Sequence, residues 1–161
     1  MAVLEDHPLN RPTFIPWPPI LLLGALAGAW IAGIVVPFPW PGENDQPAHL
    51  IGLGFGVAGL ALAVWAAMTL KRENTTILPH RGASRLVTTG PYAWRRNPIY
   101  LGDTLMLLGI AELTHNIWFA VSALLFVGLV TGLAILPEER HLAAKFGDDW
   151  HRYWERTRRL L

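Results

Sequence analysis

The 161-residue chain has no cysteine and few charged residues, and both shortages exclude classes of protein. Without cysteine it has no disulfide, no thiolate metal ligand and no cysteine nucleophile. Only 16% of its residues are charged and 52% are hydrophobic, which is too apolar for a soluble domain of this size. The net charge of +1 gives no argument for nucleic-acid binding.

Several familiar chemical signatures are also missing. There is no P-loop, no G-x-G-x-x-G after a strand and no assembled Ser/His/Asp set. The six histidines are scattered without the spacing of a metal site, so we expect none. Residues 1–19 lack the basic region of a secretory signal, so we do not expect a cleaved leader.

What the chain does contain is apolar runs, which predict an all-α, polytopic membrane protein. The runs cover residues 20–38, 48–70, 98–113 and 117–136. A helix needs about 20 residues to span the hydrocarbon core, and only 98–113 is clearly short. Alone it could be re-entrant or a buried soluble helix. Because only residues 114–116 separate it from the fourth run, we expect the two to form a tight membrane hairpin.

The basic residues predict the orientation. Of 13 lysines and arginines, one precedes the first run, six lie between the second and third, and six follow the fourth. With four spans all of them fall on one side, while Glu43, Asp45 and Glu112 fall on the other. The positive-inside rule then predicts four transmembrane helices with both termini in the cytoplasm. Without the third span, the basic C-terminal tail would lie on the opposite face.

Glycines and prolines predict two local features of the N-terminal half. Gly52, Gly54, Gly56 and Gly59 line the start of the second run, where small residues allow helices to approach closely in lipid. Residues 79–82 (Pro-His-Arg-Gly) predict a turn in the connection that follows the second run.

The segment 88–102 (TTGPYAWRRNPIYLG) is a rigid basic turn directly before the third run. Asn97 is a favoured N-cap and Pro98 a favoured first helical residue, so a helix should begin at Pro98. Its N-terminus would then attract a carboxylate or phosphate, with Arg96 as a fixed cation beside it. Arg95 is expected to meet lipid phosphates.

Two tyrosines flank these arginines. Gly90 and Pro91 form a stiff elbow that aims Tyr92 toward the same place. Tyr92 and Tyr100 could stack on a ligand or hydrogen-bond to it, or they could be ordinary interfacial tyrosines.

Two adjacent carboxylates, Glu138 and Glu139, follow Pro137 where the fourth run ends. A hairpin would bring them to the same end as Arg96. Neighbouring residues point to different helix faces, so at most one should face the site and the other should face water. The convergence of a cation, a carboxylate, aromatics and a capped helix end predicts a pocket for a zwitterionic small molecule.

The polar segment after Pro137 predicts a cytoplasmic amphipathic helix. Leu142, Phe146, Trp150 and either Tyr153 or Trp154 recur at helical spacing, with an interruption at Gly147. Such a helix could anchor the chain to the membrane surface or cover the site as a lid.

Taken in order, these blocks resemble the isoprenylcysteine carboxyl methyltransferase and phospholipid methyltransferase superfamily. The resemblance covers roughly residues 86–158: Leu86 to Tyr92, Arg96 to Gly102, Glu138-Glu139, then Phe146 to Trp150 with Tyr153 and Arg156. It implies one integral-membrane domain over 1–161, with a two-helix part at 1–85 and a catalytic, cofactor-binding part at 86–161. It also implies a methyltransferase that uses S-adenosylmethionine in a cytoplasm-facing pocket and takes a lipophilic substrate, a lipid amine or an isoprenylcysteine-like carboxylate, from the bilayer. A small thiol also stays open as the methyl acceptor.

The resemblance assigns roles by position. The catalytic residues are Arg96, Glu138 and Glu139, and those expected at the substrate are Asp103, Tyr153 and Arg156. The residues expected to bind or shape the cofactor site are Gly90, Pro91, Tyr92, Arg96, Asn97, Pro98, Tyr100, Gly102, Glu138 and Glu139. Membrane lipids are the other expected partners, and no nucleic acid is expected.

The chain departs from the superfamily pattern at three positions. Asn97 stands where histidine is usual, Trp150 where tyrosine is common, and Ala134 where prenylcysteine enzymes often carry an arginine. Two alternative functions stay open: a fold-related NADPH-dependent membrane reductase and a non-catalytic four-helix membrane protein.

Overall fold

The computed structural model of the chain describes residues 15–42, 45–75 and 85–160. Three features considered above lie outside these residues: the N-terminal segment up to residue 14, which includes Arg11; Glu43; and the turn expected at residues 79–82.

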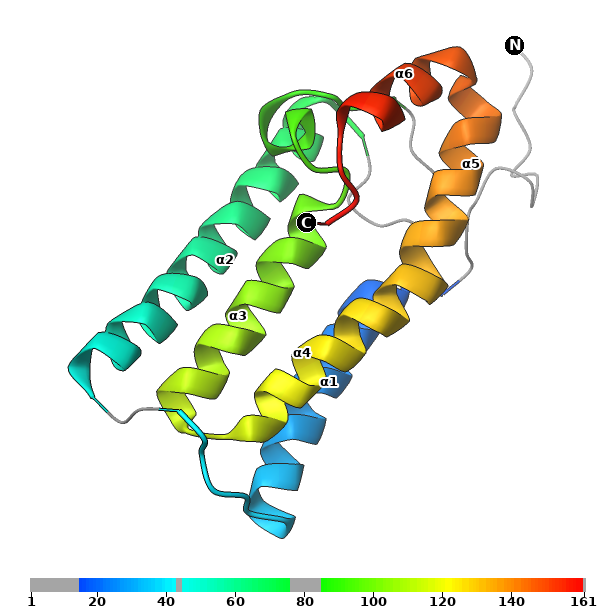
Figure 1. Cartoon of the computed structure of the whole chain (residues 1–161). Coiled ribbons are helices and arrows are strands. Elements are labelled where there is room, and N and C mark those ends of the chain that lie inside the picture. Colours follow the sequence, from blue (N-terminus) through cyan, green and yellow to red (C-terminus); the bar gives the residue numbers. More distant parts are fainter. Residues whose placement is uncertain (1–14, 43–44, 76–84, 161) are drawn as a thin grey trace.

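All regular elements of the described residues are helical, as predicted. The helices are α1 (Trp17–Val35), α2 (Gln46–Arg72), α3 (Pro98–Thr114), α4 (Ile117–Val130), α5 (Leu136–Phe146) and α6 (Asp148–Arg156). A 3-10 turn, η3 (Gly90–Ala93), precedes α3, and a π turn, η4 (Thr131–Ile135), joins α4 to α5. Figure 1 shows α2, α3 and α4 side by side, α1 against α4, and α6 folded back over one end of the bundle.

Within the described residues, three helices are long and apolar enough to cross a membrane: Trp17–Val35, Gln46–Arg72 and the continuous helix Ile117–Phe146. Large apolar side chains are exposed along α1, α2 and α4, as expected for surfaces that face lipid. The chain is therefore an integral membrane protein. Helix α3 has 17 residues, about 25 Å of rise. That is short of the ~30 Å hydrocarbon core.

The fourth helix is longer than the sequence predicts, because it does not end at Pro137. Proline lacks an N–H, and its ring crowds the carbonyl four residues earlier, here that of Leu133. The wide π turn lies immediately before Pro137, and the helix then continues to Phe146. This extension carries Glu138 and Glu139 along the bundle instead of into a separate surface helix.

Glycine contacts fix α3 against α2. A Cβ on Gly59 would lie 2.5 Å from the Gly102 carbonyl oxygen, and one on Gly102 would lie 2.6 Å from the Gly59 oxygen. Gly52 similarly faces Glu112 of α3, whereas a Cβ on Gly54 would meet nothing within 4 Å. The predicted close approach is therefore confirmed for Gly52 and Gly59, and Gly54 does not take part.

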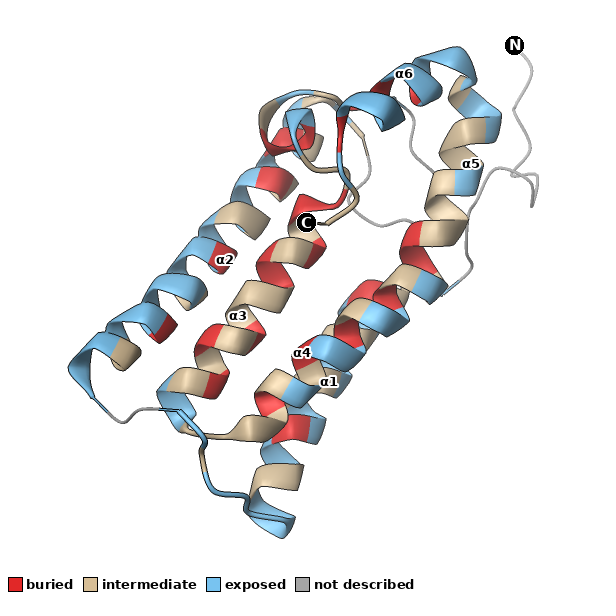
Figure 2. Ribbon diagram, in the orientation of Figure 1, coloured by how far each residue is buried: buried red, intermediate tan, exposed pale blue. Residues whose placement is uncertain are grey.

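The core lies where α3 meets α4 and α1. Leu107 of α3, Phe126 and Val130 of α4 and Ala29 of α1 are all at most 1% exposed. Figure 2 shows buried residues along most of α3, which makes it the central helix of the bundle. A second, smaller cluster of Ala66, Val87 and Tyr92 packs where α2 ends beside η3.

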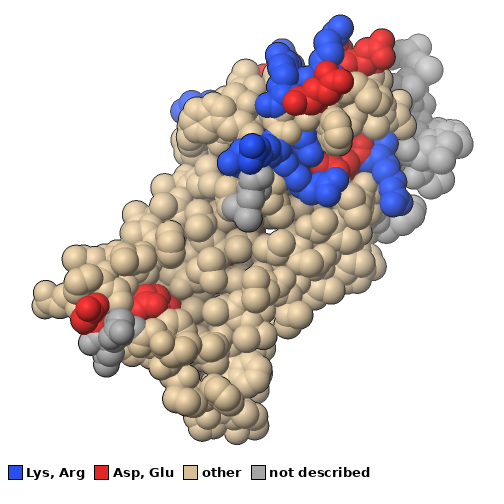
Figure 3. Space-filling view, in the orientation of Figure 1, with Lys and Arg blue, Asp and Glu red and all other residues tan. Residues whose placement is uncertain are grey.

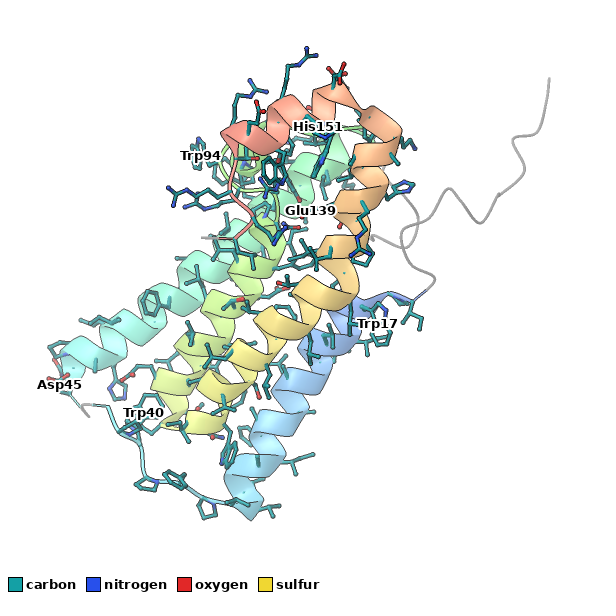
Figure 4. The ribbon with its side chains drawn as sticks, turned by 45° about the vertical axis from the view of Figure 1, so that its right-hand side comes forward. Trp17, Trp40, Asp45, Trp94, Glu139 and His151 are labelled. Carbon is teal, nitrogen blue, oxygen red and sulfur yellow. The ribbon has the colours of Figure 1, made fainter. Side chains whose placement is uncertain are left out.

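The two ends of the bundle differ in charge. On the face shown in Figure 3, lysines and arginines gather around α5, α6 and the start of α3. At the opposite end of this face, the charged side chains that are visible are acidic. That opposite end also carries Trp40 and Asp45 (Figure 4).

Candidate active site

A cavity opens at the basic end, where α2 ends, α3 begins, and α5 and α6 meet. Seven of the residues predicted for the site line it: Tyr92, Arg96, Asn97, Tyr100, Glu138, Glu139 and Tyr153. The predicted hairpin therefore brings the basic turn and the glutamate pair together.

The elbow before α3 is built as the sequence predicts. Gly90 has φ +59°, a conformation that costs other residues free energy, and a Cβ there would lie 2.9 Å from the Thr69 hydroxyl of α2. Pro91 and Tyr92 are buried directly after it. Trp94 packs edge-on against Trp65 of α2, with ring centroids 6.0 Å apart. The turn is thereby fixed to α2.

Helix α3 begins at Pro98 as predicted, but the Asn97 side chain does not cap it. Asn97 occupies the N-cap position without a side-chain capping hydrogen bond. Its Nδ2 instead donates to the carbonyl of Arg159, 3.1 Å away. The amide is thus used to hold the C-terminal segment.

Arg96 is bound within the protein from three directions. Its Nε donates to Oε1 of Glu139 at 3.1 Å, and its Nη1 donates to the carbonyl oxygens of Trp154, at 3.0 Å, and of Thr157. The guanidinium also lies 5.5 Å from the centroid of the Trp154 ring. Only 7% of the Arg96 side chain is exposed. In this conformation Arg96 connects α5 to α6 and the C-terminal segment.

The two adjacent glutamates have different partners. Glu139 accepts from Arg96 and also from Arg159, whose Nη2 lies 2.7 Å from Oε2 and whose Nε lies 3.1 Å from Oε1. This pairing raises the pKa of Arg159. The Glu139 side chain is 12% exposed, so the expectation that the second carboxylate would face water is wrong.

Glu138 also lines the cavity and is half-buried. Among the described residues it has no hydrogen bond or salt bridge. A carboxylate that is partly shielded from solvent and lacks a nearby cation is electrostatically unfavourable, and such groups are common at functional sites.

Part of the cavity lining is aromatic. Tyr92 and Tyr100 line the cavity, and within the described part of the chain neither hydroxyl makes a hydrogen bond. Burial raises the pKa of Tyr92 far above its ordinary value, and the nearby charge of Glu138 raises it further. Tyr92 therefore stays a neutral phenol that can donate a hydrogen bond to a ligand.

Helix α6 covers the cavity, which favours the lid over the membrane anchor. The chain breaks at Gly147, with φ +50°, as predicted. Trp150 and Tyr153 turn inward to line the cavity, whereas Trp154 is 48% exposed. The Tyr153 hydroxyl donates to the backbone carbonyl of Tyr92 at 2.8 Å. Burial raises the pKa of Tyr153, so this donor stays protonated.

Other predicted site residues lie away from the cavity lining. Gly102 faces Gly59, and Asp103 is buried within α3. Arg156 is exposed and donates to the carbonyl of Arg152. The remaining three, Gly90, Pro91 and Pro98, shape the backbone around the cavity.

Sequence reasoning missed the contribution of Thr157 and Arg159. They follow α6 in a basic run that resembles a solvated tail, and no spacing marks them. Their distant partners, Glu139, Arg96 and Asn97, lie 20 to 62 residues away in sequence, so only the folded chain brings them together. Within the described residues, no three His, Asp or Glu side chains are placed to hold a metal ion.

Together these features define an integral membrane protein with a cavity, lined by apolar, aromatic and charged side chains, at the open end of a helical hairpin. The sequence model of the phospholipid methyltransferase family matches residues 47–149, from α2 to the start of α6. The chain therefore belongs to that family, within the isoprenylcysteine carboxyl methyltransferase-like superfamily. No solved structure matches the chain.

Three curated proteins are similar over parts of the chain. The cobalt-zinc-cadmium resistance protein CzcN of Cupriavidus metallidurans is 31% identical over 73% of this chain and 51% of its own length. The nickel-cobalt-cadmium resistance protein NccN of Alcaligenes xylosoxydans is 28% identical over 65% of this chain and 47% of its own. The inner membrane-spanning protein YciB of Thioalkalivibrio sulfidiphilus is 35% identical over 48% of this chain and 38% of its own length. The chain thus spans about half the length, or less, of these relatives.

Proposed function

We propose that the protein is an S-adenosylmethionine-dependent methyltransferase that acts on a lipophilic substrate embedded in the membrane. Membership of the phospholipid methyltransferase family supports methyl transfer in general. The observation that carries the specific proposal is Glu138, a carboxylate that has no counter-cation among the described residues and shares a cavity with Tyr92 and Tyr100, whose hydroxyls make no hydrogen bond within those residues.

The lining fits the proposed cofactor. S-adenosylmethionine carries a cationic ammonium and a sulfonium, and it supplies an electrophilic methyl group when bound. Glu138 would balance the cationic part, the hydroxyls of Tyr92 and Tyr100 would donate to its polar groups, and Trp150 offers an aromatic face. The lid helix α6 would exclude water and hold donor and acceptor in line, which can supply most of the rate enhancement of a displacement.

The charges of the cavity favour an amine acceptor over an isoprenylcysteine-like carboxylate. A carboxylate acceptor needs a cation beside it, but Arg96 and Arg159 both bind Glu139, and Arg85 pairs with Glu73 at 2.9 Å. An amine must lose a proton before it attacks. Glu138, which has no cationic partner in the part of the chain that the structure describes, could accept that proton.

The proposal includes the topology. We place α3 across the membrane as a fourth, short span, with both termini and the cavity on the cytoplasmic side. The gathering of lysines and arginines at the cavity end supports this orientation. Lipid substrate would reach the cavity from the bilayer, and the cofactor from the cytoplasm.

Calorimetric titration of the purified protein in detergent tests the proposal. We expect wild type to bind S-adenosylmethionine and not NADPH, because a 2′-phosphate needs free cations and the cavity arginines are paired. Glu138→Gln should weaken that binding, whereas Glu155→Gln, at an exposed position on α6, should not. Binding of NADPH instead would favour the reductase, and binding of neither would favour a non-catalytic protein.

Arg96→Ala should also abolish cofactor binding or turnover. The expected cause is loss of the connection between α5 and α6, since the guanidinium is already bound by Glu139 and two carbonyls. Undiminished methyl transfer by this variant in proteoliposomes would contradict the role given to Arg96.

A further inference from the structure

The chain after α6 runs back beside the turn that precedes the N-terminus of α3. The N–H of Arg96 donates to the carbonyl of Arg158 at 2.9 Å, and the N–H of Arg158 donates to the carbonyl of Trp94 at 3.3 Å. These bonds form a short parallel bridge between the basic turn and the C-terminal segment. In Figure 1 the end of the chain descends beside the start of α3.

Side-chain hydrogen bonds and apolar contacts also hold the C-terminal segment in place. Arg159 makes a two-pronged pair with Glu139 of α5, and Asn97 donates to the Arg159 carbonyl. Leu160 packs against the core cluster that contains Tyr100 and Ile135. Figure 4 shows Glu139 at the same end of the molecule as Trp94 and α6.

We propose that residues 157–160 form a latch that holds the cavity in its binding conformation, and that Arg159 is the positioning residue of this latch. Arg159 acts through Glu139, which in turn binds Arg96. Arg96 binds the carbonyl oxygens of Trp154 and Thr157, at the end of the lid helix. The identity of the ligand in this inference rests on the proposed function.

The latch explains the unequal use of the two glutamates. Arg159 and Arg96 both bind Glu139, so this carboxylate holds the latch and Glu138 is left for the ligand. If the latch is released, the wall formed by the basic turn and α6 must be ordered again when ligand binds. The apparent Kd then rises in inverse proportion to the population of the latched state.

Neighbouring arginines provide a matched test. Arg159→Gln removes the pair with Glu139, whereas Arg158→Gln makes the same charge change at an exposed position whose bonds to the turn are made by its backbone. We expect Arg159→Gln to raise the calorimetric Kd for S-adenosylmethionine about tenfold, which corresponds to a latched population of about a tenth. Arg158→Gln should leave the Kd unchanged, and Arg159→Lys should restore much of the affinity.

The titration separates positioning from misfolding, because misfolded protein lowers the stoichiometry and leaves the Kd of the remaining sites unchanged. An unaltered Kd in Arg159→Gln, or equal weakening in Arg158→Gln, would overturn the inference.

A second measurement does not depend on the cofactor. Because the chain has no cysteine, Arg140→Cys and Arg158→Cys can place two spin labels, one on α5 and one on the latch, at exposed positions. We expect a narrow distance distribution that broadens when Arg159→Gln is added. An unchanged distribution would overturn the latch. If wild type fails to bind S-adenosylmethionine, the proposed function fails, and the spin-label distances still decide whether the latch exists.

Discussion

Replacing each of the two adjacent glutamates by glutamine should change stability in opposite directions. Glu139→Gln keeps the shape of the side chain but removes the charge that two guanidiniums share. Arg96 is then left 7% exposed without its carboxylate. Breaking a buried ion pair from one side costs about 3–5 kcal/mol. Arg96 keeps two carbonyl acceptors and Arg159 is 39% exposed, so we expect the lower end, about 3 kcal/mol.

Glu138→Gln removes a charge that has no partner among the described residues. Its desolvation is then relieved, and the variant should be as stable as wild type or more stable by about 1 kcal/mol. Activity should move the other way, because Glu138 is the carboxylate that we assign to the ligand. A stabilising substitution that removes activity is expected where a site holds an unfavourable charge.

Thermal unfolding in detergent, followed by the fluorescence of the eight tryptophans, measures the difference. For a chain of this length about 1 kcal/mol corresponds to about 2–4 °C, so Glu139→Gln should lower Tm by about 6–12 °C. Glu138→Gln should leave Tm unchanged or raise it by up to about 4 °C. Equal losses in both variants would refute the unequal pairing of the glutamates on which the site description depends.

Two further predictions concern helix packing and the lid. Gly102→Ala should destabilise the contact between α2 and α3 by about 1–3 kcal/mol, because the new methyl group would meet the Gly59 carbonyl. Gly28→Ala, where nothing lies within 4 Å, is the control, and an equal Tm for the two variants would contradict the packing. Tyr153→Phe should cost about 1–3 kcal/mol, because it leaves the Tyr92 carbonyl without its buried donor. It should also weaken calorimetric binding of S-adenosylmethionine, and full affinity would argue against a lid held by this bond.

Local signals predicted much of the fold because they act over a few residues. The Asn97-Pro98 pair marked the first residue of α3, and Gly147 marked the break before α6. The short connection expected at residues 114–116 correctly predicted the hairpin of α3 and α4, which residues 115–116 join in the structure. Apolar run length found the three long helices, but it left α3 marginal, and its 17 residues remain short by length alone.

The errors arose where a distant partner or a backbone irregularity decides the outcome. A regular helical repeat cannot anticipate the π turn before Pro137, which shifts the faces of the residues that follow it. Sequence spacing therefore could not assign Glu138 and Glu139 to their partners. Asn97 was a reasonable cap by residue type, but its amide binds the backbone of Arg159, 62 residues away. Arg96 does line the cavity, but its contacts within the protein could not be predicted from the sequence.

Methyl transfer is the most direct test of the central claim. Purified wild type and Glu138→Gln would be placed in vesicles that contain an aminophospholipid, with methyl-labelled S-adenosylmethionine outside and a prenylcysteine added in a parallel sample. We predict label in the lipid amine fraction for wild type, and a rate lower by at least about 10²-fold for Glu138→Gln, within the range of about 10²–10⁴ expected for the loss of a general base. Absence of label from both acceptors, with S-adenosylmethionine unbound, would contradict the account.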